Sequence, residues 1–499
     1  MRQVINLQLQ LSEVEISQIE IDLRSRDETP KLLQGLQYLY GIPDTRREVF
    51  QILEGMIPEQ IDAHNGRPGL DLWKILVLGS LRLNSNWDYD KLQDIANNHK
   101  TLRQMLGHGI LNQNDTYALQ TLKDNVPLLT PEILDQVNQV VVKAGHSLVG
   151  NKEKELKGRC DSFVVKTNVH YPTDINLLFD AVRKVITLIA QSCSEVGLQG
   201  WRQSHHNIRK IKKLFRKAQQ LKRSTSKDET KKAKRVKLII AAHQGYIDVV
   251  QSFLERSLST IDSLRRYPKI SEPRIEEISQ AMAHADRQVD QIRRRVIQGE
   301  SIPHIEKVFS IFEEHTEWIS KGKAGVPQEL GLRVCILEDQ HRFILHHQVM
   351  EQQTDDVVTV SMVSETQERY STLTGCSFDK GFYSPLNQQE LEKLLDQVVL
   401  PKKGGLSLSE KEVESSDWFI GSRRQHSAVE SAIHALENHG LDRCPDHGLI
   451  GFKRYVALAV VARNLQTLGT IVQKKELRRQ KRRQKFIQGR EQEHYRSVA

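Results

Sequence analysis

The chain has 499 residues, of which 27% are charged and 38% hydrophobic, and its formal net charge at pH 7 is +9. That length provides for roughly two to four domains with an ample core. No stretch reaches the apolar length of a membrane span, and the N-terminus lacks the long apolar run of a signal peptide. We therefore expect a soluble, cytoplasmic protein that makes no membrane contact. Five scattered cysteines without a Cys-x-x-Cys pair favour free thiols over a zinc ribbon or a disulfide framework.

The positive charge is concentrated in two segments. Residues 202–237 contain 15 Lys and Arg against two acids, and residues 474–499 contain ten against three. Concentrated positive charge attracts polyanions, so nucleic acid is the partner that these segments favour. A solvated, charged helix face is the alternative for each segment taken alone.

Residues 1–150 have the periodicity of an all-helical region. In residues 72–83 the apolar side chains recur on one helical face, and the same spacing resumes at 92–105 after a break. This pair resembles a helix-turn-helix, which either reads DNA or belongs to an ordinary helical bundle. Pro131 then fits the first turn of a further helix that reaches Val142.

The clearest strand signal lies in residues 159–174, which are rich in Val, Phe, Thr and Tyr and include Pro172 near their end. Asp161 lies near the start of this strand. A carboxylate held on rigid backbone suits metal binding, because the sheet fixes its oxygens. The alternative is a strand-edge acid that only prevents pairing between sheets.

Residues from about 176 to 320 return to helical periodicity with many charges, which predicts a helical hairpin inserted into a sheet domain. One helix has an apolar stripe through Ile208, Ile211 and Phe215, and residues 224–228 predict the turn that follows it. Five basic residues cover much of the remaining surface of this helix, and we expect them to contact DNA: Arg209, Lys210, Lys213, Arg216 and Lys217.

Strand signal resumes with a predicted hairpin at 332–337 and 342–349, followed by a further candidate strand at 354–361. A short strand at 376–384 then has Asp379 in its middle. A helix is predicted from Leu386 and a buried strand at 398–401.

From Ser422 the chain is predicted to be helical to about Asn438, with His426, Glu430 and His434 at i, i+4 and i+8 on one face. This spacing also fits a zinc-binding face, although the neighbouring arginines and oxygen-rich partners favour a harder metal. A helix over 455–468 and the basic tail follow.

Asp161, Asp379 and Glu430 form an ordered set of two strand acids and one helix acid. Three converging carboxylates can hold two Mg²⁺ ions about 4 Å apart, which is the requirement for an in-line phosphodiester displacement. Oxygen ligands select Mg²⁺ or Mn²⁺ over zinc. Convergence of the three acids is therefore the decisive expectation.

A resemblance to a known family is carried by the same residues. Cys160–Asp174 resembles the first catalytic block of prokaryotic insertion-sequence transposases of the Asp-Asp-Glu (DDE) class. Asp379–Ser384 resembles the second block, and Arg423–Glu430 with Asn438–Arg443 resembles the third. Within the class the chain is most similar to the ISNCY-type group, over nearly its whole length.

The resemblance implies an α/β (α+β) architecture with a ribonuclease H-like (RNase H-like) catalytic domain. We place that domain at residues 151–185 and 326–470, and its catalytic and metal-binding acids at Asp161, Asp379 and Glu430. The other expected regions are an all-helical DNA-binding and assembly region at 1–150, a basic helical insertion at 186–325 and a basic tail at 471–499.

The resemblance also implies a function. Such an enzyme binds the terminal inverted repeats of its element, cleaves at the 3′ ends and joins them to target DNA, using about two Mg²⁺ or Mn²⁺ ions per site. We expect a homodimer or larger assembly on double-stranded DNA in the nucleoid of a prokaryotic cytoplasm. Further DNA contacts are expected from two arginines beside the third block and four in the tail: Arg423, Arg424, Arg478, Arg479, Arg482 and Arg483.

The chain departs from the wider class around the third acid. Related enzymes often place Tyr, Arg and Lys at positions that are occupied here by Arg423, His426 and Glu437. Glu437 is therefore the alternative third acid, and Asp339 is the alternative second acid. Two other functions stay open, namely a DNA-binding protein of transposase descent without turnover and a metal-dependent nuclease without strand transfer.

Overall fold

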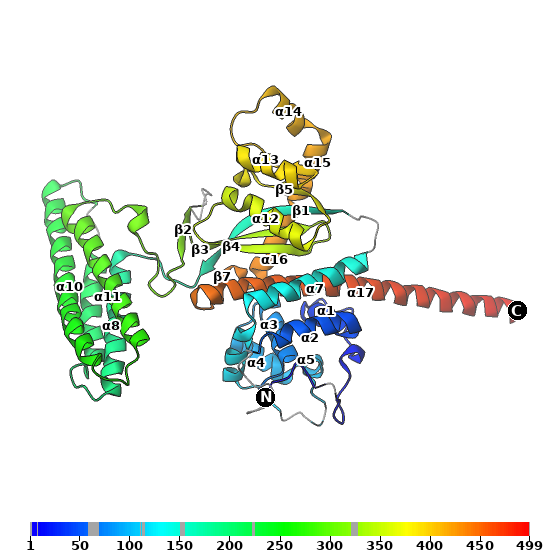
Figure 1. Cartoon of the computed structure of the whole chain (residues 1–499), viewed down its shortest axis with the longest axis horizontal. Helices are drawn as coiled ribbons and strands as arrows, with labels where there is room; N and C mark the ends of the chain where they lie inside the picture. Colours follow the sequence, from blue (N-terminus) through cyan, green and yellow to red (C-terminus); the bar gives the residue numbers. More distant parts are fainter. Residues whose placement is uncertain are drawn as a thin grey trace. The chain divides into compact units, whose positions relative to one another are not determined.

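The computed structural model consists of two compact units, Met1–Asn168 with Ile319–Ala499 and Val169–Trp318 (Figure 1). We refer to them as the first and second units. Side chains are described as far as residue 488. The structure describes residues 2–6, 8–57, 69–109, 111, 115–149, 155–221, 225–320 and 328–498.

The regular elements described in the N-terminal part of the first unit are all helices, as the sequence predicts, although residues 2–6, 8–15 and 19–28 are irregular. Its α3 is almost wholly buried, and α7 begins at Pro131, which suits a first turn because proline lacks the N–H that would go unpaired there. Asp88 caps α4 by accepting the N–H of Lys91 at 2.8 Å. The elements are η1 (Ile16–Gln18), α1 (Thr29–Gly41), α2 (Pro43–Glu54), α3 (Leu72–Asn84), α4 (Tyr89–Asn98), α5 (Lys100–Met105), α6 (Leu119–Asn125), η3 (Val126–Leu128) and α7 (Pro131–Val149).

A mixed seven-stranded sheet forms the other half of the first unit. Its order is β2-β3-β1-β5-β6, with β4 paired to β3 and β7 paired to β1. β1 is antiparallel to β3 and parallel to β5, and β5 is parallel to β6. The predicted hairpin is confirmed as β3 and β4. The strands are β1 (Leu156–Thr167), β2 (Glu317–Ser320), β3 (Gln328–Asp339), β4 (Ile344–Met350), β5 (Leu373–Phe378), β6 (Gln397–Val399) and β7 (Arg443–Cys444).

The strand predicted at 354–361 is wrong, because these residues begin α12 (Asp355–Arg369). Two acids in its first turn favour the positive end of the helix dipole, and Val358 and Met362 lie in the core, which outweighs the strand preference of the valines. The other helices of this part are η6 (Lys380–Phe382), α13 (Pro385–Leu394), α14 (Leu408–Ser415), α15 (Asp417–His426), α16 (Ala428–Leu436) and η7 (Glu437–Leu441). The single helix predicted over 422–438 is therefore two helices that meet at Ser427.

The central element of the first unit is α17 (Gly448–Val498), which lies between the sheet and the N-terminal helices (Figure 1). Its first half is apolar and buried among α1, α3, α7 and β4. Gly35 and Gly469 let α1 and α17 approach closely, because a Cβ at Gly35 would lie 2.2 Å from the carbonyl oxygen of Leu465. The sequence predicts this helix over residues 455–468, and in the structure it extends beyond both limits.

The expectation that no stretch reaches the apolar length of a membrane span is wrong, because among the described residues the segment Gly448–Gln488 of this helix is long and apolar enough to cross a membrane. Of its most apolar window, 72% is buried inside the protein. That burial is consistent with the core helix of a soluble protein.

All five cysteines are buried and free.

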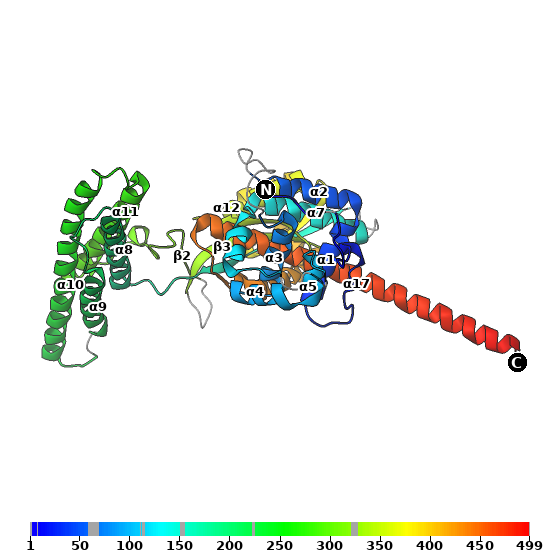
Figure 2. The ribbon, with the colours of Figure 1, turned by 90° about the horizontal axis from the view of Figure 1, so that it is seen from below.

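The second unit is a helical bundle with its own apolar core, in which α8, α10 and α11 lie side by side (Figure 2). It begins at Val169, so α8 packs with the bundle, whereas the sequence boundaries place residues up to 185 with the sheet. Residues 299–316 are mostly irregular rather than helical. The elements are α8 (Asp174–Glu195), α9 (Ser204–Gln220), α10 (Glu229–Leu264), α11 (Glu272–Ile292), the π-helical η4 (Arg293–Gln298) and η5 (His304–Glu306).

Candidate active site at the β1 and β5 fork

Asp161 lies in β1, and Asp379 directly follows β5, which runs parallel to β1. The ladder between β1 and β5 ends where Cys160 pairs with Phe378, and each aspartate is the next residue of the chain, so the sequence prediction of a strand through Asp379 is wrong. Beyond this point β1 pairs with β7 only at Lys166 and Thr167. Among the described strand pairs, residues 161–165 therefore have no neighbour on that side, and the sheet forks with the two aspartates at the fork.

Glu430 reaches the fork from a helix. It is exposed in the first turn of α16, which contacts β1, while the preceding α15 contacts β5. His426, the last residue of α15, has its Nδ1 3.0 Å from the Oγ of Ser377 on β5. This hydrogen bond fixes the end of α15, and hence the start of α16, against the strand that leads to Asp379.

The electrostatics of Asp161 show that the acids gather. Burial is the main cause that raises its pKa from 3.8 to about 6, and the negative charges of Asp379, Asp355 and Glu430 raise it further. The N–H of Ser162, 2.7 Å from Asp161 Oδ1, acts in the opposite direction. The two other predicted acids and a fourth carboxylate therefore lie within electrostatic reach of Asp161.

That fourth carboxylate is Asp355, the first residue of α12, which the sequence analysis did not single out. Its Oδ1 accepts a hydrogen bond from Ser162 Oγ at 2.6 Å. Gly381 follows Asp379 closely, and a Cβ there would lie 2.9 Å from Asp355 Oδ2, so a larger residue would displace this carboxylate from its present position. The available signal was the Thr354-Asp355-Asp356 start of a helix, which was hidden by the mistaken strand prediction.

The four acids supply the hard oxygen donors that Mg²⁺ and Mn²⁺ prefer. Within the described parts of the chain, no group of three or more His, Cys, Asp or Glu side chains is arranged as the ligands of one ion. The donor chemistry fits a divalent cation, and the mutual repulsion at Asp161 is the interaction that such a cation would relieve.

The charged residue nearest to the fork on β1 is Arg159, which makes an ion pair with Glu338 of β3 at 3.3 Å. Glu338 is only 2% exposed, and burial raises its pKa to about 7 although Arg159 opposes the shift. His426 is half-buried, and burial lowers its pKa below 6.5 although Asp379 acts against this shift. We therefore expect a neutral imidazole beside the acids at pH 7.

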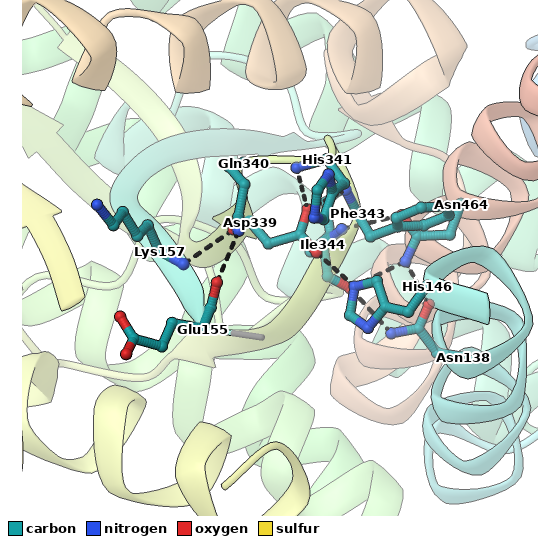
Figure 3. Close-up of polar contacts among 10 residues, drawn as sticks. All are labelled: Asn138, His146, Glu155, Lys157, Asp339, Gln340, His341, Phe343, Ile344 and Asn464. Atoms are coloured by element: carbon teal, nitrogen blue, oxygen red, sulfur yellow. Dashed lines mark hydrogen bonds and ion pairs between the residues drawn. The ribbon is translucent and has the colours of Figure 1, made fainter. Parts of the chain in front are cut away.

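The alternative second acid, Asp339, occupies a different environment at the end of β3 (Figure 3). Its Oδ1 accepts the N–H groups of His341 and Phe343 at 2.8 and 2.9 Å, and its Oδ2 lies 2.6 Å from His146 Nε2. The side chain is fully buried. Its Oδ1 therefore closes the turn between β3 and β4, and its Oδ2 is held by a residue of α7, so the carboxylate is engaged in the fold.

The alternative third acid, Glu437, lies on η7 after α16 and lines a separate hollow of about 370 Å³ with Lys166, His434 and Asp442. It is not among the charges that shift the pKa of Asp161 or His426, whereas Glu430 shifts both. The structure thus brings Glu430 to the fork. His434, which shares the hollow of Glu437, does not join His426 in a ligand set.

The basic residues expected to contact DNA are all exposed. Those of the second unit are on α9, those beside the third block are in the last turn of α15, and those of the tail are on α17. Arg479 is paired with Glu476 at 3.6 Å. The eleven residues are Arg209, Lys210, Lys213, Arg216, Lys217, Arg423, Arg424, Arg478, Arg479, Arg482 and Arg483.

A polar groove of about 450 Å³ adjoins the fork. It is lined by the first half of β1, by β5 and β6, and by α15, and it includes Lys157, Arg159 and Ser377. Two cationic side chains and several amides on its walls suit a phosphate-bearing chain. Its lining ends at Arg159 and Ser377, two residues before Asp161 and Asp379 along the chain.

Comparisons of this chain with protein-family models, with curated proteins and with solved structures found no match. The chemistry of the site is therefore inferred from its own residues. Its acids, the imidazole of His426 and the groove beside Arg159 are the kinds of group that metal-dependent phosphodiester chemistry uses.

Proposed function

We propose that this chain is a DNA transposase of the Asp-Asp-Glu class, which cleaves the ends of its element and joins them to target DNA. The observation that carries the proposal is the meeting of Asp161, Asp379 and Glu430, from segments more than 200 and about 50 residues apart, at one fork of the sheet. A set of acids from distant segments serves no evident purpose in folding, because their charges repel one another.

The sheet supports an RNase H-like catalytic domain. Three antiparallel strands in the order β4-β3-β1 continue into the parallel strands β5 and β6, and α12 and α13 make the connections. Ligands of mixed and parallel sheets gather at the carboxyl ends of parallel strands, where Asp379 follows β5. The helical second unit interrupts this domain between β1 and β2.

Asp161, Asp379 and Glu430 would hold the metal ions, with Asp355 beside them as a further oxygen donor. Mg²⁺ or Mn²⁺ bound there supplies the activation of water or a 3′-hydroxyl and the stabilisation of the leaving oxygen. His426 is a positioning residue, because its hydrogen bond to Ser377 fixes the helix that carries Glu430. The groove beside Arg159 orients the phosphate backbone.

DNA binding is assigned to the exposed basic residues of α9, α15 and α17. Such contacts release counterions, so the logarithm of the affinity should fall steeply with the logarithm of the salt concentration. The enzyme is proposed to act as a homodimer or larger assembly on double-stranded DNA, in the nucleoid of a prokaryotic cytoplasm.

The test is cleavage and joining of DNA that carries the ends of the element, with Mg²⁺ or Mn²⁺. Asp161→Asn, Asp379→Asn and Glu430→Gln should each abolish both reactions and leave DNA binding intact. Asp396→Asn is the matched control, since Asp396 is an exposed acid of the same domain just before β6. A fully active Asp161→Asn or Asp379→Asn variant would contradict the proposal.

The same experiment separates the other two functions. Cleavage without joining by the wild type would favour the metal-dependent nuclease. Specific binding without cleavage, in every metal tested, would favour the DNA-binding protein without turnover. If Glu430→Gln alone stays active, the third acid is elsewhere, and Glu437→Gln is the next variant.

A further inference from the structure

The second unit contains a pocket of about 680 Å³ that lies wholly within it and has no part in the site at the fork. The first turn of α8, the end of α11 and the segment 299–318 line it. Its volume is within the range of small-molecule sites in proteins. A specific ligand requires groups that recognise it, and the walls supply two kinds.

One wall of the pocket is aromatic. The ring of Trp318 has its centroid 5.7 Å from that of Tyr171 and 5.7 Å from that of Phe309, and the ring of His304 lies tilted at 5.3 Å from that of Phe309. Trp318 and Phe309 are only partly buried and Tyr171 is exposed, so ring surface is accessible. Aromatic rings of this kind stack on planar heterocycles such as nucleobases.

The other recognition group is the amide of Gln288, on α11. Its side chain is fully buried, it lines the pocket, and neither its Oε1 nor its Nε2 has a hydrogen-bond partner. Buried amides are nearly always paired, so this one calls for a partner in the pocket. Gln291, one turn further along, differs because its amide donates to the carbonyl of Glu306 at 2.7 Å.

An unpaired glutamine amide presents one donor and one acceptor side by side. This pattern is complementary to adenine, whose N7 accepts and whose N6 amine donates. The lining also contains two cations, Lys307 and Arg295, and two carboxylates, Asp174 and Glu300. Arg295 is paired with Asp174, with Nη2 2.9 Å from Oδ1, and Glu300 is paired with Arg294 at 2.9 Å. Lys307 is exposed, so a phosphate attached to the base would meet this cation.

We propose that this pocket binds an adenine base that bears a phosphate, with Gln288 pairing to N6 and N7 and the aromatic wall stacking on the ring. The ligand is either a free adenine nucleotide or an unpaired adenine of a DNA strand. Binding needs neither the acids of the fork nor a metal ion, so it stands apart from the proposed function.

The experiment is calorimetric titration of the full-length chain with AMP, IMP and 7-deaza-AMP, and with a short oligo(dA) strand. IMP lacks the N6 amine and 7-deaza-AMP lacks the N7 acceptor, so each should bind roughly 5- to 100-fold more weakly than AMP. Gln288→Leu, which approximately keeps the size of the side chain, should weaken the binding of AMP to a similar extent. Gln244→Leu is the matched control, because Gln244 bonds Asp248 on α10 and does not line the pocket.

The outcomes decide the source of the base. Tighter binding of AMP than of oligo(dA) per adenine identifies a free nucleotide, and the reverse identifies an unpaired base of a strand. The proposal is overturned if neither binds at millimolar concentration, or if AMP and 7-deaza-AMP bind equally. Because that last comparison uses the wild type, it holds even if Gln288→Leu fails to fold.

Discussion

Two regions of the same sheet contain acidic residues in opposite circumstances. At the end of β3, the carboxylate of Asp339 is fully buried and both of its oxygens meet donors from the turn and from His146. At the fork of β1 and β5, Asp161 is bonded to the N–H of its own neighbour and faces three further acids. The first arrangement stabilises the fold, while the second costs stability, which is the pattern that the proposed metal site would explain.

The largest effect on folding is expected at Asp339, whose carboxylate oxygens have hydrogen-bond partners. Asp339→Ala leaves two backbone N–H groups and a histidine without their acceptor, so the free energy of unfolding should fall by about 3–5 kcal/mol. Urea denaturation measures it, with Asp396→Ala as the exposed control. A loss below about 1 kcal/mol would remove the distinction between the two regions.

A slightly smaller effect is expected at Glu338, whose pKa of about 7 in the fold exceeds the ordinary value of 4.5. Because the folded state binds this proton more tightly than the unfolded state, protonation of Glu338 stabilises the fold. The stabilisation is complete below pH 4.5 and is lost as the pH rises through 7. The free energy of unfolding of Glu338→Gln, relative to that of the wild type, should therefore rise by about 2–3 kcal/mol from pH 5 to pH 8. Denaturation at both pH values tests this, and a constant difference would contradict it.

At the fork, removal of a charge should stabilise the protein. The pKa of Asp161, about 6 rather than 3.8, means that stability is lost as the pH rises through 6. At pH 8 without metal, Asp161→Asn should raise the free energy of unfolding by about 1–3 kcal/mol while it abolishes cleavage. A destabilised variant would instead make Asp161 a structural residue.

In the wild type, a bound metal ion should relieve the same repulsion at Asp161 and so stabilise the folded state. At a Mg²⁺ or Mn²⁺ concentration ten times the Kd, the free energy of unfolding should rise by about 1.4 kcal/mol. The Asp161→Asn and Asp379→Asn variants should respond less, and Asp339→Asn should respond as fully as the wild type. Thermal unfolding with and without metal provides the measurement. An equal response in all the variants would place the ion elsewhere.

The smallest effect is expected at Glu437. Since Glu430, and not Glu437, contributes to the field at Asp161, Glu437→Gln should change the cleavage rate by less than about twofold. A loss comparable to that of Glu430→Gln would show that both helix acids serve the reaction.

Much of this organisation could be predicted from the sequence. Strong periodicity located α3 and α9, and β-branched residues located β1 and the β3–β4 hairpin. Two errors share one cause, namely that tertiary packing overrides local preference. Thr354–Ser361 has valines that favour a strand but begins a helix, and the helix over 422–438 is broken at Ser427 although no glycine or proline marks the break.

The candidate site was predicted in part. The order of Asp161, Asp379 and Glu430 along the chain was visible, but their approach depends on strand register and on a helix break. Asp355 was missed because its role arises from contact with Ser162, which is 193 residues away in the sequence. The unpaired amide of Gln288 leaves no trace in a sequence at all, because only the fold determines which atoms lack a partner.

The close approach of Gly35 and Gly469 has a consequence for how the protein is made. The helix α1 buries its apolar face against a helix that lies more than 400 residues later in the chain. While the ribosome is still translating the middle of the message, α1 has no surface on which to pack, and the first unit cannot complete its core. A polypeptide truncated before α17 should therefore be degraded rather than act as a partial enzyme or a competing DNA binder.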